Sequence, residues 1–454
     1  MTATPNSPEA RDIAALLHPY TNLARHGEIG PHVFTHGQGI YVYDSQGKAY
    51  IEGLSGLWCT ALGYGEEALV EVAAEQMRTL SFAPIFAHRS HAPAIDLAEK
   101  LIELIPAPVS KIFFAGSGSG ANDTAIKLIW YYNNALGRPQ KKKLISRTKA
   151  YHGVSVATAS LTGLPANHAD FDLPIERVLH TDCPHYYRFA QPGESEEDFA
   201  TRLAQNLEEL ILAEGPETVA AFFAEPVMGA GGVLIPPKSY FEKIQAVLRR
   251  YDVLFVADEV ICGFGRTGNM FGFETYGIAP DMVSMAKQLS SGYLPIGALS
   301  VPPAMFEAMV SQSEKIGTFG HGNTYSAHPV CAAVALKTVE IMAERDILGH
   351  VRAVAPQFQA RLGALADHPL VGEARGVGLI GALELVADKA ARRPFEPDQA
   401  IGARAVELAR ENGLLCRAMG DAVALCPPLI ITREQIDDLF DRLTRALDAL
   451  AASL

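Results

Sequence analysis

A lysine and an aspartate each end an apolar run, and together they carry the clearest chemical signal in this chain. Lys287 closes the run that begins at Asp281, and Asp258 closes the run that begins at Val253. Burying a charge is costly unless it has a partner, and the carboxyl ends of strands in open α/β sheets are where ligands bind. An amine and an acid at that edge suggest a carbonyl cofactor held as a Schiff base, with the acid on a pyridinium nitrogen. Either residue alone would be a surface lysine or a capping aspartate, and the pair with its surroundings favours the chemical interpretation.

A stretch of small residues upstream could hold an anionic group. Ser117, Gly118 and Ser119 lead into a run with helical composition. Small residues let the backbone approach a ligand closely, and the free N–H groups at a helix N-terminus favour an anion. Phosphate binding and a plain tight turn with a capping serine both fit this stretch.

The same stretch also matches the dinucleotide-binding pattern Gly116-x-Gly118-x-x-Ala121, which is weak when taken alone. That interpretation needs an acidic residue about 20 positions further on. The stretch Lys143–Lys149 contains none, although Arg147 could mimic an NADP site. A nicotinamide-dependent dehydrogenase therefore stays open as an alternative.

Four further residues follow apolar runs or precede helical ones. Tyr151 could stack on a planar cofactor, or pack on the surface. Glu225 could orient a cofactor hydroxyl or a neighbouring side chain, or form part of a capped turn. Thr324 suits a helix N-cap and equally a phosphate. Arg417 could bind a carboxylate, although most arginines in apolar surroundings are structural ion-pair partners.

Two motifs contain metal-binding residue types. They are His88-x-x-His91 and His180-x-x-Cys183-x-His185. Neither has the paired spacing of a structural zinc site. The sequence also lacks a GxSxG elbow and a Walker loop. We therefore expect no metal centre.

The elements that must position these residues alternate between short apolar runs and helical stripes from about residue 111 to about residue 301. This alternation is typical of a mostly parallel sheet wrapped by helices. The apolar runs are Lys111–Phe114, Leu144–Ile145, Val219–Phe223, Val253–Val256, Met282–Ala286 and Ala298–Val301. Upstream, Ile40–Tyr43 and Ala49–Ile51 predict a β-hairpin, and Ala94–Ile105 predicts an amphipathic helix. After about residue 325 the pattern indicates long helices with fewer strands.

Composition limits the class of protein. With 454 residues, 20% charged and 48% hydrophobic, the chain is typical of a globular protein with two domains, or one large domain with an appendage. A net charge of -13 argues against nucleic acid and anionic membranes as partners. Six scattered cysteines favour reduced thiols, and no apolar stretch is long enough to span a bilayer. The first residues lack a signal-peptide pattern, so we expect a cytoplasmic protein.

With these residues in place, the chain resembles the class III (omega) aminotransferases, which are fold-type I pyridoxal phosphate enzymes. The similarity extends from Gly56–Trp58 to Cys426–Pro428. Its most specific stretches are Val256–Gly268 and Pro280–Lys287.

The resemblance implies an α/β fold with a large domain and a smaller α+β domain. The large domain contains a mostly parallel seven-stranded sheet flanked by helices. Residues 1–60 are expected to pack with the small domain, residues 61–325 to form the large cofactor-binding domain, and residues 326–454 to form the C-terminal small domain.

The resemblance also assigns roles to individual residues. Lys287 would form the Schiff base with pyridoxal 5'-phosphate and shuttle the proton, and Asp258 would hold the pyridine nitrogen protonated. The other implied cofactor-binding residues are Ser117, Gly118, Ser119, Tyr151, His152, Glu225, Val260 and Thr324. Thr324 matches a residue that reaches the phosphate from the neighbouring subunit, which implies an obligate homodimer. Pairing of dimers into tetramers stays open.

Substrate class follows from the implied pocket walls, which are Trp58, Phe86, Tyr151, Ala230 and Arg417. The arginine of that family swings in to bind an α-carboxylate and out to admit an apolar group. This suits ping-pong transfer of an amino group from an amine or ω-amino acid to a keto acid such as pyruvate. Decarboxylation or amino-group migration on the same scaffold remains an alternative.

Two positions depart from the pattern of that family. Glutamate is common where Gly120 stands, and glycine is common where Gln288 follows the lysine. Neither departure removes an indispensable group, so we expect activity. Their effect on cofactor affinity stays open.

Overall fold

The centre of the molecule is a seven-stranded, mostly parallel sheet, as predicted. In the computed structural model, which describes residues 4–454, the strand order is β4-β10-β9-β8-β7-β5-β6. Six strands run in one direction, and β10 is antiparallel to both of its neighbours. The strands of this sheet are β4 (Lys111–Ala115), β5 (Lys143–Arg147), β6 (Val178–Thr181), β7 (Val219–Ala224), β8 (Leu254–Asp258), β9 (Met282–Met285) and β10 (Gly297–Val301).

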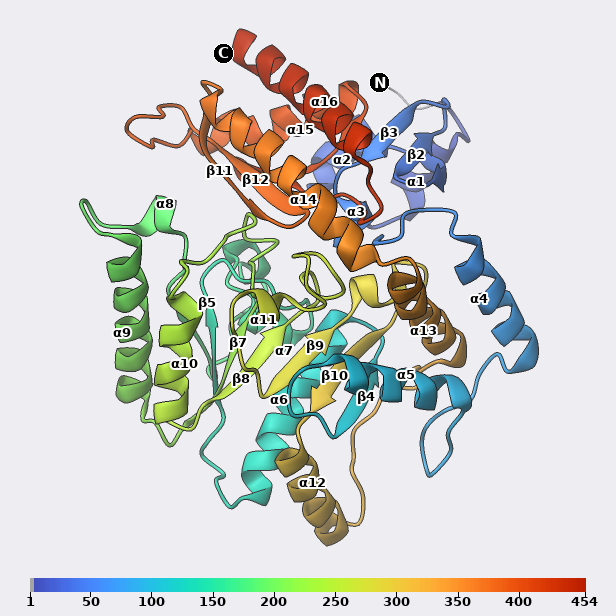
Figure 1. The fold of residues 1–454 in the computed structure, drawn as a ribbon, viewed down its shortest axis with the longest axis vertical. Helices are drawn as coiled ribbons and strands as arrows, with labels where there is room; N and C mark the ends of the chain where they lie inside the picture. Colours follow the sequence, from blue (N-terminus) through green and yellow to red (C-terminus); the bar gives the residue numbers. More distant parts are fainter. Residues whose placement is uncertain (1–3) are drawn as a thin grey trace.

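Helices cover both faces of the sheet, which is why its central strands are apolar on both sides. Every residue of β7 is buried. Phe222 belongs to the apolar cluster that includes α9 (Glu196–Glu214) and α10 (Tyr240–Arg250), whereas Phe223 belongs to the cluster that includes α6 (Gly118–Ala135) and α7 (Val156–Leu161). Figure 1 shows α9 and α10 beside β7 and β8, with α6 and α12 (Pro303–Ile316) at the lower end.

A second, smaller layer lies above the large domain in Figure 1. It contains an antiparallel sheet with the order β11-β12-β15-β14 and three long helices. These elements are β11 (Val371–Val377), β12 (Ile380–Leu385), β14 (Arg417–Met419), β15 (Ala422–Leu425), α14 (Ile347–Ala364), α15 (Ile401–Glu411) and α16 (Arg433–Ala452).

The first strands of the chain join this C-terminal part. β1 (Phe34–Gln38), β2 (Tyr41–Asp44) and β3 (Ala49–Glu52) form an antiparallel meander, and β13 (Leu414–Leu415) adds to β3 in parallel. The N-terminal strands therefore share a sheet with a segment that is close to the other end of the chain. This pairing supports the proposal that the N-terminal segment packs with the small domain.

The remaining helices connect these parts. α13 packs against α4 and α5 at the edge of the large domain. The connecting helices are α1 (Pro8–Ala15), α2 (Leu23–Ile29), α3 (Ser55–Trp58), α4 (Glu67–Thr79), α5 (Ala92–Leu104), α8 (Tyr186–Phe189), α11 (Gly272–Thr275) and α13 (Pro329–Glu344). Short 3-10 turns lie at η1 (Pro165–Asn167), η2 (Lys287–Ser290), η3 (Leu365–Asp367) and η4 (Pro397–Gln399). Among residues 4–454, no helix has the length and apolar character that crossing a membrane requires.

The structure confirms the predicted hairpin, the helix at Ala92–Leu104 and the six apolar strands, but two expectations fail. The sequence missed β6, which is an edge strand with only half of its residues buried and therefore has no continuous apolar run. The expectation of fewer strands after residue 325 is wrong, because β11 to β15 all lie there. β13, β14 and β15 have two to four residues each, too few to show a period of two.

Candidate active site

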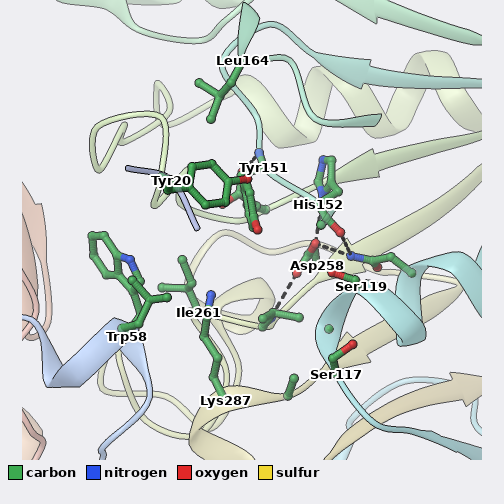
Figure 2. A pocket seen from close by; sticks show the side chains of 18 of the residues that line it. Tyr20, Trp58, Ser117, Ser119, Tyr151, His152, Leu164, Asp258, Ile261 and Lys287 are labelled. Carbon is green, nitrogen blue, oxygen red and sulfur yellow. Dashed lines mark hydrogen bonds and ion pairs between the residues drawn. The ribbon is translucent and has the colours of Figure 1, made fainter. Parts of the chain in front are cut away.

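A cavity of about 870 Å³ opens where the carboxyl ends of the parallel strands meet the small domain. Its walls come from the loops after β4, β5, β7, β8 and β9, together with Trp58 and the strand that carries Arg417. This position agrees with the rule that ligands bind outside the carboxyl ends of strands in open α/β sheets. Figure 2 shows the side chains that face the cavity.

Lys287 lies at the floor of this cavity with its amine pointing inward (Figure 2). It lies two residues after the end of β9 and has a φ of 43°, which is unfavourable for a residue with a Cβ and is typical of strained functional positions. Burial lowers the pKa of the amine, and the nearby carboxylates of Asp258 and Glu225 partly oppose that effect. A lowered pKa increases the fraction of neutral amine, which is the form able to act as a nucleophile or base.

Asp258 ends β8 and is held rigidly by its neighbours. Its Oδ2 accepts a hydrogen bond of 2.7 Å from Asn122 Nδ2 and lies 2.8 Å from His152 Nδ1. Its Oδ1 accepts a hydrogen bond of 3.1 Å from the backbone N–H of Val260. Because two side chains and one backbone group hold the carboxylate, its position and orientation at the cavity are fixed.

Glu225 follows β7 and organises the loop that carries Tyr151. Its two carboxylate oxygens accept hydrogen bonds of 3.0 Å from the backbone N–H groups of Tyr151 and Gly229. Burial raises the pKa of this carboxyl. Glu225 therefore binds protein backbone on both oxygens, which supports the interpretation that it orients neighbouring groups.

The start of α6 faces the same cavity. Ser117 is the N-cap and accepts a hydrogen bond of 3.0 Å from the Gly120 N–H. The N–H groups of Gly118 and Ser119 precede the first intrahelical bond, and no acceptor within residues 4–454 binds them. A Cβ at Gly118 would lie 2.9 Å from Val260 Cγ2, so a glycine is required for this close approach. The helix thus offers free donors to an anion.

Most residues that the sequence singled out meet at this cavity. Those that line it are Trp58, Ser117, Gly118, Ser119, Tyr151, His152, Glu225, Ala230, Asp258, Val260, Lys287 and Arg417. Arg417 has no ion-pair partner among the described residues. A guanidinium on a cavity wall without a carboxylate of its own is available to a ligand.

Phe86 and Thr324 are not part of this wall. Both are exposed, and Phe86 lies against Gly322, two residues before Thr324. The structure therefore brings these two segments together on the surface of the chain, outside its own cavity.

Other candidates have structural partners. Arg147 is fully buried, donates a hydrogen bond of 2.6 Å to the Glu225 carbonyl and lies over the rings of Tyr240 and Phe241. Because Arg147 is buried and does not line the cavity, it is not placed for the NADP-binding role that the sequence allowed. Among the metal candidates, His91 caps α5 and His185 binds Glu373.

Sequence reasoning missed several residues of the cavity. Asn122 is one turn into α6 and reaches Asp258, so its position four residues after Gly118 was the available signal. Tyr20 and Leu164 also line the cavity (Figure 2). Both come from irregular segments, where no sequence periodicity predicts which way a side chain points.

The donor set fits a pyridine cofactor with a phosphate group. Free N–H groups at the start of α6 suit the phosphate, the fixed Asp258 carboxylate suits a protonated ring nitrogen, and the neutral form of Lys287 suits a carbonyl carbon. This fold and this site define a fold-type I pyridoxal phosphate enzyme.

Comparison with known proteins defines the family. Residues 23–447 match the model of the aminotransferase class-III family, to which this chain belongs. It is 54% identical over 433 residues to gamma aminobutyrate transaminase 3, chloroplastic, of Solanum lycopersicum, covering 95% of this chain and 83% of that protein. It is 53% identical to gamma-aminobutyrate transaminase 1, mitochondrial, of Oryza sativa subsp. japonica, over 96% of this chain and 84% of that protein.

Solved structures agree with this result. The omega transaminase of Pseudomonas jessenii in complex with PMP superimposes with a TM-score of 0.97 at 53% identity, covering 98% of this chain and 99% of that chain. A structure described as a transaminase with L-ala covers 93% of this chain and 99% of that chain, with a TM-score of 0.92 and 57% identity. The chain is a pyridoxal-phosphate-dependent aminotransferase.

Proposed function

We propose that this aminotransferase takes its amino group from a primary amine or an ω-amino acid and gives it to a small keto acid such as pyruvate. The observation that carries the proposal is Arg417, a guanidinium on the cavity wall without a carboxylate partner in the described part of the chain. A cation of this kind binds the carboxylate of a keto acid or an ω-amino acid. The relatives named as gamma-aminobutyrate transaminases make γ-aminobutyrate one candidate donor.

Different residues of the cavity have different roles in the reaction. When bound, pyridoxal phosphate supplies a protonated ring that accepts the electron pair released as the substrate carbon loses its proton. Asp258, held in place by Asn122 and His152, would bind the ring nitrogen and keep it protonated. Lys287 Nζ, with its lowered pKa, would accept the proton from the amine-bearing carbon of the donor and deliver it to the carbon on the other side of the nitrogen.

The remaining cofactor contacts are assigned by position. Ser117, Gly118 and Ser119 hold the phosphate at the start of α6. Tyr151 and Val260 would hold the ring, while His152 positions Asp258 and Glu225 positions the backbone of Tyr151. Trp58 and Ala230 bound the substrate side of the cavity.

Phe86 and Thr324 complete the site of a second copy of the chain in this proposal. Their joint exposure outside their own cavity supports a homodimer in which each site is finished across the interface. Phe82 and Tyr325 are also exposed beside them, with ring centroids 5.9 Å apart, and add apolar surface for such an interface. The six cysteines are free, which supports a reducing compartment such as the cytoplasm.

The substitution Arg417→Met tests the substrate class. We expect the KM for pyruvate and for γ-aminobutyrate to rise at least about tenfold, because a charge-assisted hydrogen bond is worth about 1.5–3 kcal/mol. The half-reaction with a carboxylate-free amine such as benzylamine, followed by cofactor absorbance, should change by less than about twofold. Arg78→Met, at an exposed arginine on α4, is the matched control. An equal loss with benzylamine and pyruvate would show that Arg417 supports the fold and does not select carboxylates.

A further inference from the structure

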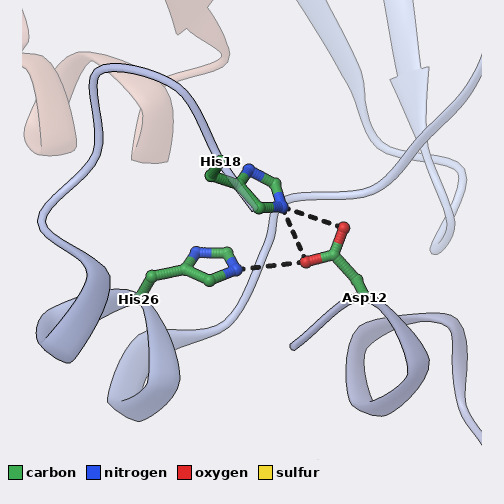
Figure 3. Close-up of side chains that lie close together, drawn as sticks. All are labelled: Asp12, His18 and His26. Atoms are coloured by element: carbon green, nitrogen blue, oxygen red, sulfur yellow. Dashed lines mark hydrogen bonds and ion pairs between the residues drawn. The ribbon is translucent and has the colours of Figure 1, made fainter. Parts of the chain in front are cut away.

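Three metal-binding side chains meet in the N-terminal segment, away from the catalytic lysine. Asp12 comes from α1, His26 from α2, and His18 from the loop between these helices (Figure 3). His18 Nε2 lies 2.9 Å from Asp12 Oδ1 and 3.0 Å from Oδ2, and His26 Nε2 lies 3.1 Å from Oδ1. The two imidazole rings face each other with centroids 4.1 Å apart. Each histidine thus points its Nε2 atom at the carboxylate of Asp12.

This geometry is close to that of a metal site. One ligand atom from each residue lies within 4.8 Å of the others. Ligands about 2.0–2.1 Å from a tetrahedral Zn²⁺ lie about 3.3 Å from each other. The observed separations of 2.9 and 3.1 Å would therefore have to widen by only a few tenths of an ångström.

The charge balance also favours a cation. The ion pairs of Asp12 within residues 4–454 are those with His18 and His26, so no lysine or arginine neutralises it. A comparable cluster, formed by His185, Glu373 and Glu384, already contains cations. There Arg375 pairs with both carboxylates and Arg188 pairs with Glu384, which leaves no net charge for a metal.

The cluster is shielded and still reachable. The side chains of Asp12 and His26 are 15% and 12% exposed, and that of His18 is 29% exposed. Partial burial strengthens the electrostatic attraction for an ion, while the exposed side of His18 admits the ion and a water ligand. We propose that Asp12, His18 and His26 form a site for one divalent transition-metal ion of the Zn²⁺ type, with water completing the coordination.

Such an ion would fix one wall of the catalytic cavity. Tyr20 lies two residues after His18 and lines the cavity, where its hydroxyl accepts a hydrogen bond of 2.6 Å from Asn167 Nδ2. Its φ is 51°, so the loop holds it in an unfavourable conformation. Joining α1, the loop and α2 through one ion would restrain the loop that presents Tyr20. This coupling rests on the proposed function of the cavity, whereas ion binding does not.

The binding test uses the cofactor-loaded enzyme and Zn²⁺ in competition with a chromophoric chelator. We expect the parent enzyme to hold one ion per chain that His26→Gln and Asp12→Asn lose, with affinity falling more than about tenfold because even outer-shell partners cost that much. His36→Gln, which changes an exposed histidine of the same N-terminal region, is the control and should bind like the parent. Co²⁺ should give the visible spectrum of a tetrahedral site in the parent and in His36→Gln only.

Two further measurements separate binding from folding and from catalysis. Zn²⁺ should raise the Tm of the parent and leave the Tm of Asp12→Asn unchanged, because only a native site gains stability from the ion. Equal stoichiometry and affinity in the parent and in both cluster variants would overturn the proposed site. If the parent binds the ion and its KM for benzylamine does not change, the coupling to Tyr20 is wrong.

Discussion

At the scale of single residues, the contacts of Gln288 explain how this chain tolerates a side chain beside Lys287. The side chain is buried, and its Nε2 donates to the carbonyls of Ile261 and Gly263 at 2.7 and 2.8 Å. Its Oε1 accepts from Arg266 Nη2 at 3.2 Å. Gln288 therefore ties the turn that carries Lys287 to the loop that follows Asp258. The departure from the family pattern thus connects the segment that carries Lys287 with the segment that carries Asp258.

We expect Gln288→Gly to lower kcat about tenfold or more and to lower the Tm. Two carbonyls and a buried guanidinium would lose a partner, and each unsatisfied buried group costs about 1–3 kcal/mol. Gln288→Met separates the loss of hydrogen bonds from the loss of side-chain volume, because it keeps the volume and removes the hydrogen bonds. Steady-state kinetics and thermal unfolding check the prediction. A Gln288→Gly enzyme with parental kcat and Tm would contradict it.

Lys287 and Asp258 could be predicted from the sequence because a charge at the end of an apolar run is conspicuous. Asn122, His152 as a partner of Asp258, and Tyr20 gave much weaker signals. Their roles arise from contacts over more than 100 residues of sequence, such as the 2.7 Å bond between Asn122 and Asp258. Tertiary pairing of this kind leaves no local pattern.

At the scale of elements, the N-terminus of α6 depends on its close approach to the loop after β8. We expect Gly118→Ala to weaken cofactor binding by about tenfold or more, because the new Cβ would lie 2.9 Å from Val260 Cγ2 and displace either the helix or the valine. Titration of the apoenzyme with pyridoxal phosphate, followed by visible absorbance, measures the effect. Gly363→Ala in α14 meets nothing within 4 Å and is the matched control. Equal affinities in both variants would show that the contact is not required.

The end of β3 carries a group that makes stability depend on pH. Burial raises the pKa of Glu52 from its ordinary value of 4.5 to about 7, and a hydrogen bond from the Leu54 N–H only partly offsets this. The folded protein therefore binds more protons than the unfolded chain between these values. The contribution of Glu52 to the free energy of unfolding therefore falls as the pH rises from 4.5 to about 7. It is lowest above about pH 7.

We accordingly expect Glu52→Gln to raise the Tm at pH 8 by at least about 2 °C and to have little effect at pH 5. Glu66→Gln is the opposite control, because Glu66 is paired with Arg345 at 2.7 Å and its pKa is lowered. Removal of the Glu66 charge should leave the Tm at pH 8 equal to that of the parent enzyme or lower. A Glu52→Gln effect of the same size at both pH values would contradict the titration argument.

At the scale of the whole molecule, the surface positions of Phe86 and Thr324 predict that two chains share each site. Co-expression of Lys287→Ala with Thr324→Val tests this. A Lys287→Ala homodimer lacks the lysine in both of its sites, and a Thr324→Val homodimer lacks the threonine in both. A hybrid dimer has one site that combines an intact lysine with an intact threonine from the partner chain. At limiting cofactor we expect on the order of a quarter of parental activity, because random pairing makes half of the dimers hybrids.

The opposite arrangement predicts a different result. If Thr324 served the cavity of its own chain, every site of the hybrid would lack either the lysine or the threonine. The mixture would then show no more activity than its two components.

The parallel pairing of β3 with β13 has a consequence for the order of synthesis. Ile51 lies opposite Leu414, so the meander of β1, β2 and β3 lacks its fourth strand until nearly the whole chain has left the ribosome. At about 5–20 residues per second, the exposed edge of β3 waits roughly 20–70 s for its partner. During that time the early part of this enzyme presents an unpaired strand, which is the stage at which a nascent chain is most open to wrong partners and to chaperones.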